Sequence, residues 1–251
     1  MELQERIDAI AIGESIDKIG VADLAPAHDF IRAQGGDFVA SLTRGISLGI
    51  FLLDPIVDFL PHRHQQWVSL SYTYHAWEVI NLRLDLACSK ISSCLQQRGY
   101  KAFPVPGSQL VNEEGISAVF SSKLAAHLAG LGWIGKNCMV ITPEHGPRIR
   151  WATVLTDAPL QPTGTPLQDR CGDCRVCVDA CPVEAFSGRA FAPDEPREMR
   201  YDARQCYDYQ GGGVKKDPTR ICGMCLYACP YGMRGDNGEK SSTGESVSPP
   251  V

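Results

Sequence analysis

Eight cysteines in the second half of the chain stand at spacings that could hold metal. The first run, CGDCRVCVDACP, has two, two and three residues between successive cysteines and ends in proline. The second run, CGMCLYACP, repeats the end of that pattern. Thiolates are soft ligands that suit iron–sulfur clusters and zinc. The two runs therefore predict a metal-binding domain whose chemistry is electron transfer or structural support.

The first run has the C-x2-C-x2-C-x3-C-P spacing of bacterial two-cluster ferredoxins, in which the fourth cysteine ligates the other cluster. The second run lacks one ligand, because Thr219 stands where a full repeat has cysteine, and Cys206 is the nearest spare thiol. Zinc or disulfides are the alternatives, but zinc usually takes two separated ligand pairs. We predict two [4Fe–4S] clusters with crossed ligands. One would be held by Cys171, Cys174, Cys177 and Cys229, and the other by Cys181, Cys206, Cys222 and Cys225.

Composition is that of a globular protein. The chain has 251 residues, 44% of them hydrophobic and 21% charged, with a net charge of −5. This acidic balance gives no reason to expect a strong nucleic-acid binder. The acidic N-terminal segment does not resemble an export signal, and no apolar run is long enough to span a membrane. Many free thiols without an export signal predict a cytoplasmic protein with no membrane association.

Alternating strand and helix patterns before the cysteines predict a mixed α/β or α+β domain. The stretch LQPTGTP, at 160–166, reads as a linker. We expect a sheet domain over 1–160, a two-cluster domain over 167–234, and a disordered polar tail over 235–251. Expected helices are 1–18, 65–98 and 121–131, and expected strands are 19–24, 45–53, 100–106, 138–142 and 148–157.

The long helix candidate 65–98 carries apolar residues at helical spacing. We assign much of its buried stripe to Leu82, Leu86, Ile91 and Leu95. Its two cysteines are expected to be core thiols without a role in metal binding.

The segment AGLGWIGKN, at 129–137, is a glycine-rich turn with several interpretations. It resembles a dinucleotide fingerprint, but it follows a helix candidate where a strand is required. It also approaches a phosphate-binding loop, but Asn137 replaces the Ser or Thr that holds magnesium. A tight turn that needs glycine conformations is the plain alternative.

This turn, the following ITPEHGPRIRWATVLTDAPL and the two cysteine runs occur in an order that resembles the epoxyqueuosine reductase and reductive dehalogenase superfamily. The chain looks closest to small epoxyqueuosine-reductase-like proteins with two [4Fe–4S] clusters. The resemblance implies a nitroreductase-like domain that holds cobalamin, followed by a two-cluster ferredoxin-like domain. It also implies that the glycine-rich turn lies close to the corrinoid.

Several residues become candidates through this resemblance. We predict cofactor contacts from residues of the turn and from one later arginine, and catalytic roles for a lysine and a tyrosine. A solvated face is the alternative for the basic residues, and aromatic packing is the alternative for the tyrosine. The cofactor candidates are Gly130, Gly132, Gly135, Lys136, Asn137 and Arg148, and the catalytic candidates are Lys123 and Tyr74.

The chain also departs from the family. Epoxyqueuosine reductases carry a proton-donating aspartate at the start of a D-x-A-P-V segment, and Ile116 stands at the matching position here. The basic residue seven positions later is kept as Lys123. The tRNA-reading helical repeats of the family follow the clusters, whereas a short polar segment follows them here. These departures lead us not to expect tRNA as the substrate.

We expect an iron–sulfur reductase that takes electrons from reduced ferredoxin or flavodoxin. Two clusters would pass them to cobalamin, which would reduce a small-molecule substrate or acceptor. One alternative is an electron-transfer protein that reduces a partner corrinoid protein. Another is an epoxyqueuosine-type tRNA reductase with a relocated acid.

Overall fold

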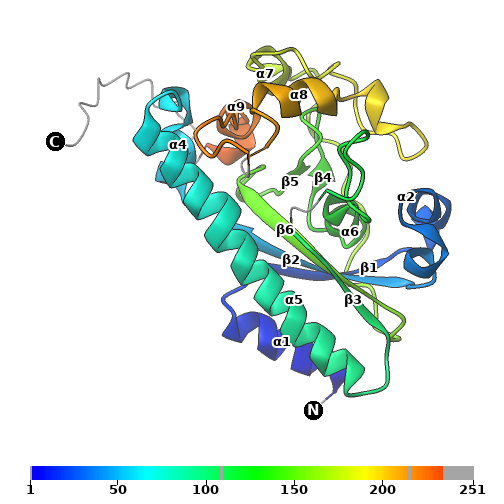
Figure 1. The fold of residues 1–251 in the computed structure, drawn as a ribbon. Coiled ribbons are helices and arrows are strands. Elements are labelled where there is room, and N and C mark those ends of the chain that lie inside the picture. Colours follow the sequence, from blue (N-terminus) through cyan, green and yellow to red (C-terminus); the bar gives the residue numbers. More distant parts are fainter. Residues whose placement is uncertain (1, 108–109, 214–215, 234–251) are drawn as a thin grey trace.

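The computed structural model describes residues 2–107, 110–213 and 216–233 (Figure 1). The segment 235–251, for which we expected disorder, lies outside the described residues.

The centre of the fold is a four-stranded sheet with the order β1-β2-β6-β3, in which all neighbours pair antiparallel. Ile46 lies opposite Val154, and Leu48 lies opposite Ala152, so their side chains share one face. The antiparallel pairing makes the fold a mixed α/β structure of the α+β kind. The strands are β1 (Lys18–Asp23), β2 (Arg44–Phe51), β3 (Ala102–Val105) and β6 (Ile149–Thr156).

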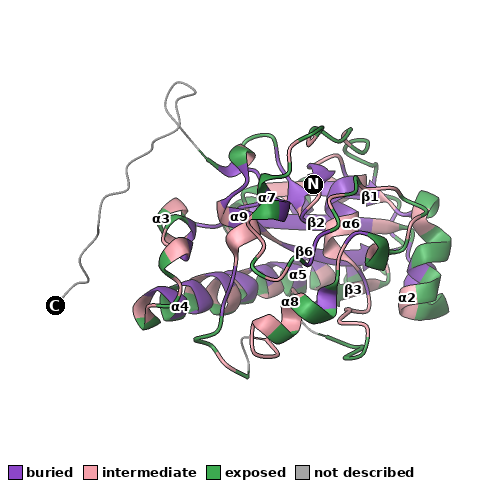
Figure 2. Cartoon of the chain, turned by 90° about the horizontal axis from the view of Figure 1, so that it is seen from above, coloured by how far each residue is buried: buried purple, intermediate pink, exposed green. Residues whose placement is uncertain are grey.

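Helices cover both faces of this sheet (Figure 1). Helices α1 (Leu3–Gly13) and α5 (Ile80–Gln96) pack on the face that carries Ile46 and Leu48. Helix α6 (Ser122–Leu128) packs on the opposite face, where α2 (His28–Ala40) adds Ile31 and Val39 to a second core. Burial follows this arrangement, because the buried residues lie along the sheet and the inner side of α5 (Figure 2).

The long helix expected over 65–98 forms, but it is not regular. It consists of α4 (Gln66–Tyr72), a π-helical segment (Thr73–Val79) and α5. The predicted stripe was wrong at Leu82 and Leu86, which are 59% and 50% exposed. The two leucines lie four residues apart, but on the opposite face from the buried series that contains Leu84, Cys88, Ile91 and Leu95.

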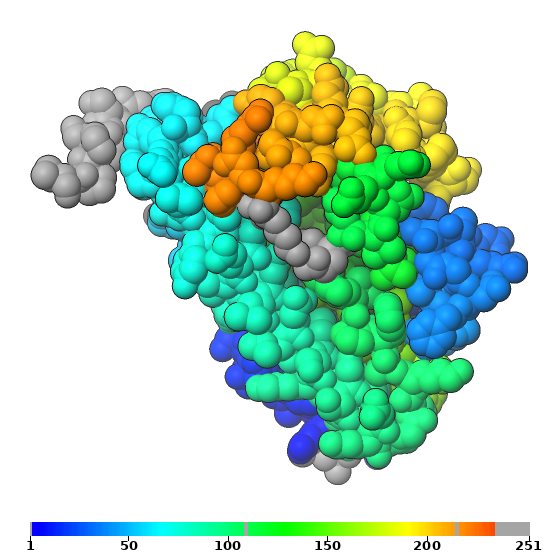
Figure 3. Space-filling model, viewed as in Figure 1, coloured from blue at the N-terminus to red at the C-terminus, as the bar shows by residue number. Residues whose placement is uncertain are grey.

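The cysteine-rich part packs at one end of the sheet, against the α3–α4 region (Figures 1 and 3). Its helices are short, as expected where loops must wrap around metal. Thr163 of the expected linker pairs with Val21 through its backbone N–H and its hydroxyl, so this segment runs along β1. The short elements are α3 (Asp54–Asp58), β4 (Trp133–Ile134), β5 (Val140–Ile141), α7 (Val176–Asp179), α8 (Ala203–Tyr209) and α9 (Met224–Tyr227).

Candidate iron–sulfur centre

The first predicted ligand set surrounds one cavity, which we call site I. Its thiols come from both cysteine runs, because Cys229 of the second run joins three cysteines of the first. Cys177 and Cys229 are buried, whereas the other two are partly exposed. The set therefore has the crossed arrangement expected for one [4Fe–4S] cluster. The cysteines that line the cavity are Cys171, Cys174, Cys177 and Cys229.

The second predicted set is also close together, and we call it site II. Cys225 lies within electrostatic range of Cys222, Cys206 and Cys181. Cys206, the thiol chosen from outside the runs, lies on α8 and interacts with Cys181. The structure thus brings one cysteine of the first run together with three from the later segment. The members of site II are Cys181, Cys206, Cys222 and Cys225.

Burial disfavours charge at these thiols. It raises the pKa of Cys177 to about 12 and that of Cys229 to about 11, and neighbouring thiols add to the effect. Burial also raises the pKa of Cys225 well above its usual value. Neutral thiols are therefore the stable state without metal, and cluster binding must release protons.

Site I is supported by the glycine-rich turn. Trp133 Nε1 donates to Cys171 Sγ at 3.5 Å, and Lys136 Nζ donates to the carbonyls of Gly172 and Cys174 at 2.6 and 3.1 Å. Asn137 lines the cavity and donates to the carbonyl of Cys225 at 3.1 Å. The turn thus holds the ligand loop of site I and contacts a ligand segment of site II.

Site II has a different surrounding. Tyr201 and Gln210 both donate to Cys206 Sγ, the latter at 3.3 Å. Burial raises the pKa of Tyr201, so its hydroxyl remains a donor. Lys123 Nζ donates to the carbonyl of Cys138 at 2.8 Å, and Arg200 Nη1 lies 3.9 Å from Cys138 Sγ. Donors and cations therefore gather on this side.

A polar group on the α5 side of the sheet lies beside site II. Tyr72 is 5% exposed and lies within electrostatic range of Cys225 and Cys222. Burial raises its pKa to about 12, so its hydroxyl is protonated at neutral pH. Arg150 stacks on Trp77 at 4.0 Å and donates to Asn81 Oδ1 at 3.2 Å. Trp77 lies in the π-helical segment Thr73–Val79, and such turns occur frequently at functional sites. We call Tyr72, Trp77, Asn81 and Arg150 the α5 polar group.

The two catalytic candidates lie in different environments. Lys123 is partly buried beside site II, as described above. Tyr74 is 64% exposed, whereas Tyr72, on the same helix, faces inward. The chemical role of each remains a prediction.

The cofactor candidates of the turn make contacts within the protein. A Cβ at Gly132 would lie 2.5 Å from the carbonyl oxygen of Ile141, and one at Gly130 would lie 2.8 Å from that of Thr165. A Cβ at Gly135 would meet the Ile141 side chain. His127 Nδ1 also pairs with the carbonyl of Gly132 at 3.0 Å. Close protein packing therefore explains these glycines without reference to a ligand.

Arg148, the last cofactor candidate, is 3% exposed and ties elements together. Its guanidinium binds Asp54 at 3.1 Å and Asp58 at 2.7 Å, which joins the start of β6 to α3. A Cβ at Gly232 would approach the same side chain. These contacts link the sheet to the end of the second cysteine run.

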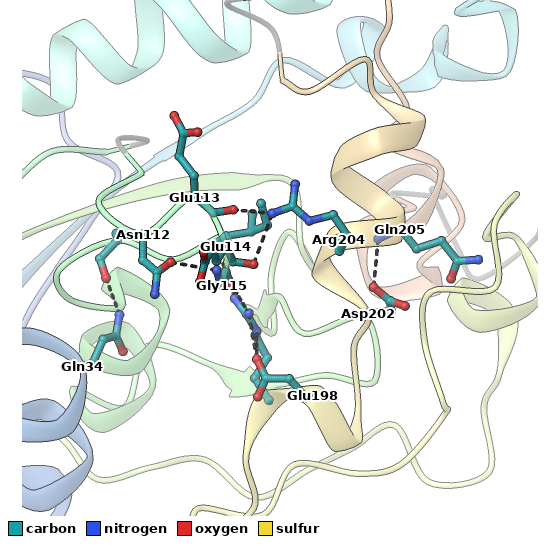
Figure 4. Close-up of polar contacts among 12 residues, drawn as sticks. Gln34, Asn112, Glu113, Glu114, Gly115, Glu198, Asp202, Arg204 and Gln205 are labelled. Atoms are coloured by element: carbon teal, nitrogen blue, oxygen red, sulfur yellow. Dashed lines mark hydrogen bonds and ion pairs between the residues drawn. The ribbon is translucent and has the colours of Figure 1, made fainter.

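The segment at the position of the family's acid is held by the cluster part (Figure 4). Arg197 Nη1 donates to the carbonyl of Ile116 at 3.0 Å, and Arg204 Nη2 donates to the carbonyl of Glu114 at 3.2 Å. Ile116 has a φ of 47°, a conformation that isoleucine rarely adopts. The backbone of this loop is therefore fixed from the cluster side, and Ile116 has no group that could donate a proton.

A comparison with family models defines the class of protein. Residues 170–232 match a 4Fe-4S double cluster binding domain. All eight cysteines of the two candidate sites lie in this range. The fold and the sites thus define a two-cluster iron–sulfur protein with a ferredoxin-like domain.

The curated relatives are epoxyqueuosine reductases. The one from Vibrio cholerae is 27% identical over 220 residues, which cover 84% of this chain and 53% of the relative. The one from Pseudomonas aeruginosa is 30% identical over 220 residues, covering 84% and 55%. The chain therefore spans about half the length of these relatives. The resemblance to epoxyqueuosine reductases is confirmed in sequence.

Solved structures share the fold. A catabolic reductive dehalogenase matches with a TM-score of 0.66 and 20% identity, covering 92% of this chain and 32% of that one. Epoxyqueuosine reductase with an epoxyqueuosine-modified tRNA stem loop matches with a TM-score of 0.53 and 20% identity, covering 92% and 65%. Among the described residues, no helix is long and apolar enough to cross a membrane. The relatives' names favour the epoxyqueuosine-type alternative over the small-substrate interpretation that we preferred from the sequence.

Proposed function

We propose that this chain is an iron–sulfur reductase that passes single electrons through clusters at site I and site II to a corrinoid. The observation that carries the proposal is the pair of adjacent cysteine sites, one of which borders the α5 polar group. Reduced ferredoxin or flavodoxin would be the electron donor, and the clusters would relay its electrons. A small molecule would be the final acceptor.

The α5 polar group supports a corrinoid between the sheet and the cluster part. Trp77 Nε1 is buried and has no hydrogen-bond partner among the described residues. Such an unsatisfied donor suits a ligand rich in amide oxygens. A related fold supports the same idea, since a reductive dehalogenase described as B12-dependent matches with a TM-score of 0.66. When bound, a corrinoid would supply a reducible cobalt close to site II.

The chain's own residues would perform the remaining work. Asn137 connects the two sites and would keep them at a fixed separation. Tyr72 would present a protonated hydroxyl beside the acceptor, because burial keeps its pKa high. Arg150 would supply a positive charge that favours an electron-rich acceptor.

Anaerobic titration of the iron-loaded chain with cob(II)alamin, followed by visible spectroscopy, tests this proposal. We expect saturable binding at micromolar concentrations and reduction of the bound corrinoid by the reduced clusters. Arg150→Met should weaken binding, whereas Arg175→Met, at an exposed site paired with Asp179, should not. A chain that holds both clusters but takes up no corrinoid would instead be an electron carrier for a partner protein.

Reduction of epoxyqueuosine in tRNA is the second candidate, and the names of the relatives favour it. Ile116 is the observation that weighs against it, because loss of the epoxide oxygen requires a proton donor. Tyr72 would then be the relocated acid, since it is buried and protonated beside site II.

The substrate test uses reduced chain, cobalamin and epoxyqueuosine-bearing tRNA, followed by nucleoside analysis. Catalytic formation of queuosine that is lost in Tyr72→Phe would establish the tRNA activity and the relocated acid together. No conversion by a chain that holds both clusters and cobalamin would support a different substrate.

A further inference from the structure

We propose that Arg200 and Lys123 set the reduction potential of the cluster at site II by placing two positive charges beside it. This inference rests on the two-cluster part of the proposed function. It does not require the corrinoid or any particular substrate.

The first observation concerns the burial and the contacts of Arg200. Its residue is 6% exposed, and its guanidinium stacks on Phe191 at 4.8 Å. The guanidinium Nε is buried without a hydrogen-bond partner, and Nη1 has Cys138 Sγ at 3.9 Å. Within the described residues, Arg200 forms no ion pair with a carboxylate. A buried arginine is thus left without a counter-ion.

Lys123 lies on the same side of site II. Its Nζ donates to the carbonyl of Cys138 at 2.8 Å, and burial together with Arg197 and Arg200 lowers its pKa, so its positive charge needs a negative partner. The lysine is within electrostatic range of Cys225 and Cys206, two ligands of site II. No carboxylate in the described part of the chain pairs with it either. Lys123 is thus near two site II ligands, and Arg200 lies next to Lys123 and Cys138.

Burying a charge is costly unless a partner of opposite sign is present. A [4Fe–4S] cluster with four thiolates carries a net negative charge, and net charge is one of the factors that set its potential. A cluster at site II would therefore supply the missing counter-ion for Arg200 and Lys123.

The same charges act on the redox equilibrium. Reduction adds one negative charge to the cluster, which burial disfavours and nearby cations favour. At site I the cation is Lys136, whose Nζ binds backbone carbonyls of the ligand loop, and Asp169 acts in the opposite sense near Cys171. The cations near site I and site II are therefore different residues, and their effects can be measured separately.

A redox titration followed by electron paramagnetic resonance, on the loaded chain, tests the inference. The Cys206→Ala variant, which should retain only the cluster at site I, assigns the two signals. For Arg200→Gln and Lys123→Gln we expect the ratio of reduced to oxidised site II cluster at fixed potential to fall tenfold or more. That change corresponds to about 59 mV for a one-electron couple. The site I potential should stay constant.

Matched variants separate charge from shape. Arg200→Lys and Lys123→Arg keep the charge and should keep most of the wild-type potential. Lys136→Gln should lower the potential of site I and leave site II unchanged. If Arg200→Gln fails to assemble, Lys123→Gln and its charge-retaining partner decide the matter. Unchanged site II potentials in the neutral variants, or equal shifts at both sites, would overturn the proposal.

Discussion

Sites I and II each have a set of four cysteine thiols but differ in what surrounds them. Both sites contain partly exposed thiols, but at site I a tryptophan N–H donates to one sulfur and Lys136 binds the ligand loop. Site II is bordered by Arg200 and Lys123, neither of which has a carboxylate partner among the described residues. Ligand spacing fixes which metal a domain holds, whereas the surroundings fix how readily that metal takes an electron.

Removal of a single site II ligand should produce the largest difference between the two sites, because one cluster is lost and the other is kept. In Cys206→Ala we expect iron to fall from about eight to about four atoms per chain, because one [4Fe–4S] cluster is lost. Iron and acid-labile sulfide analysis measures this. Cys138→Ala is the matched control, because Cys138 is a buried thiol near site II that belongs to neither set. Loss of iron from the control, with full retention in Cys206→Ala, would reassign the ligand.

Because the ligands are crossed between the two runs, a second pair of variants should also distinguish the two clusters. Cys229→Ala lies in the second cysteine run but should remove the cluster of the first, since Cys229 lines site I. Cys181→Ala should do the reverse. Spectra of each variant after reconstitution would show which signal persists. If Cys229→Ala loses the same signal as Cys222→Ala, the ligands are not crossed.

The glycine-rich turn should matter for site I through packing. In Gly132→Ala, the new Cβ would lie 2.5 Å from the Ile141 carbonyl, so β4 and β5 must separate. We expect a loss of about 1–3 kcal/mol in unfolding free energy, which is typical of overpacking. Thermal unfolding of the loaded chain measures it. Gly13→Ala, which meets nothing within 4 Å, should leave the melting temperature almost unchanged. Equal stability of the two variants would show that packing does not explain this glycine.

Arg148→Met should have the smallest effect and should leave the potentials of both sites unchanged. Its loss breaks the link to Asp54 and Asp58, but both carboxylates are about half exposed and can be rehydrated. We expect a cost of about 1–2 kcal/mol, measured by denaturant unfolding. A selective loss of corrinoid binding at unchanged stability would instead support the cofactor role predicted from the sequence.

The sequence predicted the cysteine sets well because metal ligands are encoded by local spacing. Most strands were also predictable from short apolar runs, as β1, β2 and β6 show. The buried face of α5 was harder to predict from the sequence, because Leu82 and Leu86 have the same spacing as the residues that are buried. Only the position of the sheet decides which face of a helix is covered.

The surroundings of the sites were harder to predict. Arg200, Lys123 and Tyr72 come from segments far apart in the chain, and only folding brings each of them near a cysteine. The glycines of the turn suggested close approach to a ligand, whereas the structure shows close approach to Ile141 and Thr165. A small residue signals that something lies near, but not what it is.

The most direct test of a two-cluster relay is the number of electrons that the loaded chain accepts. Anaerobic titration with dithionite, followed by visible absorbance, should end at about two electrons per chain, one for each cluster. Cys206→Ala should end at about one. An endpoint of one electron in the wild-type chain, or none, would contradict the claim that both cysteine sites hold redox-active clusters.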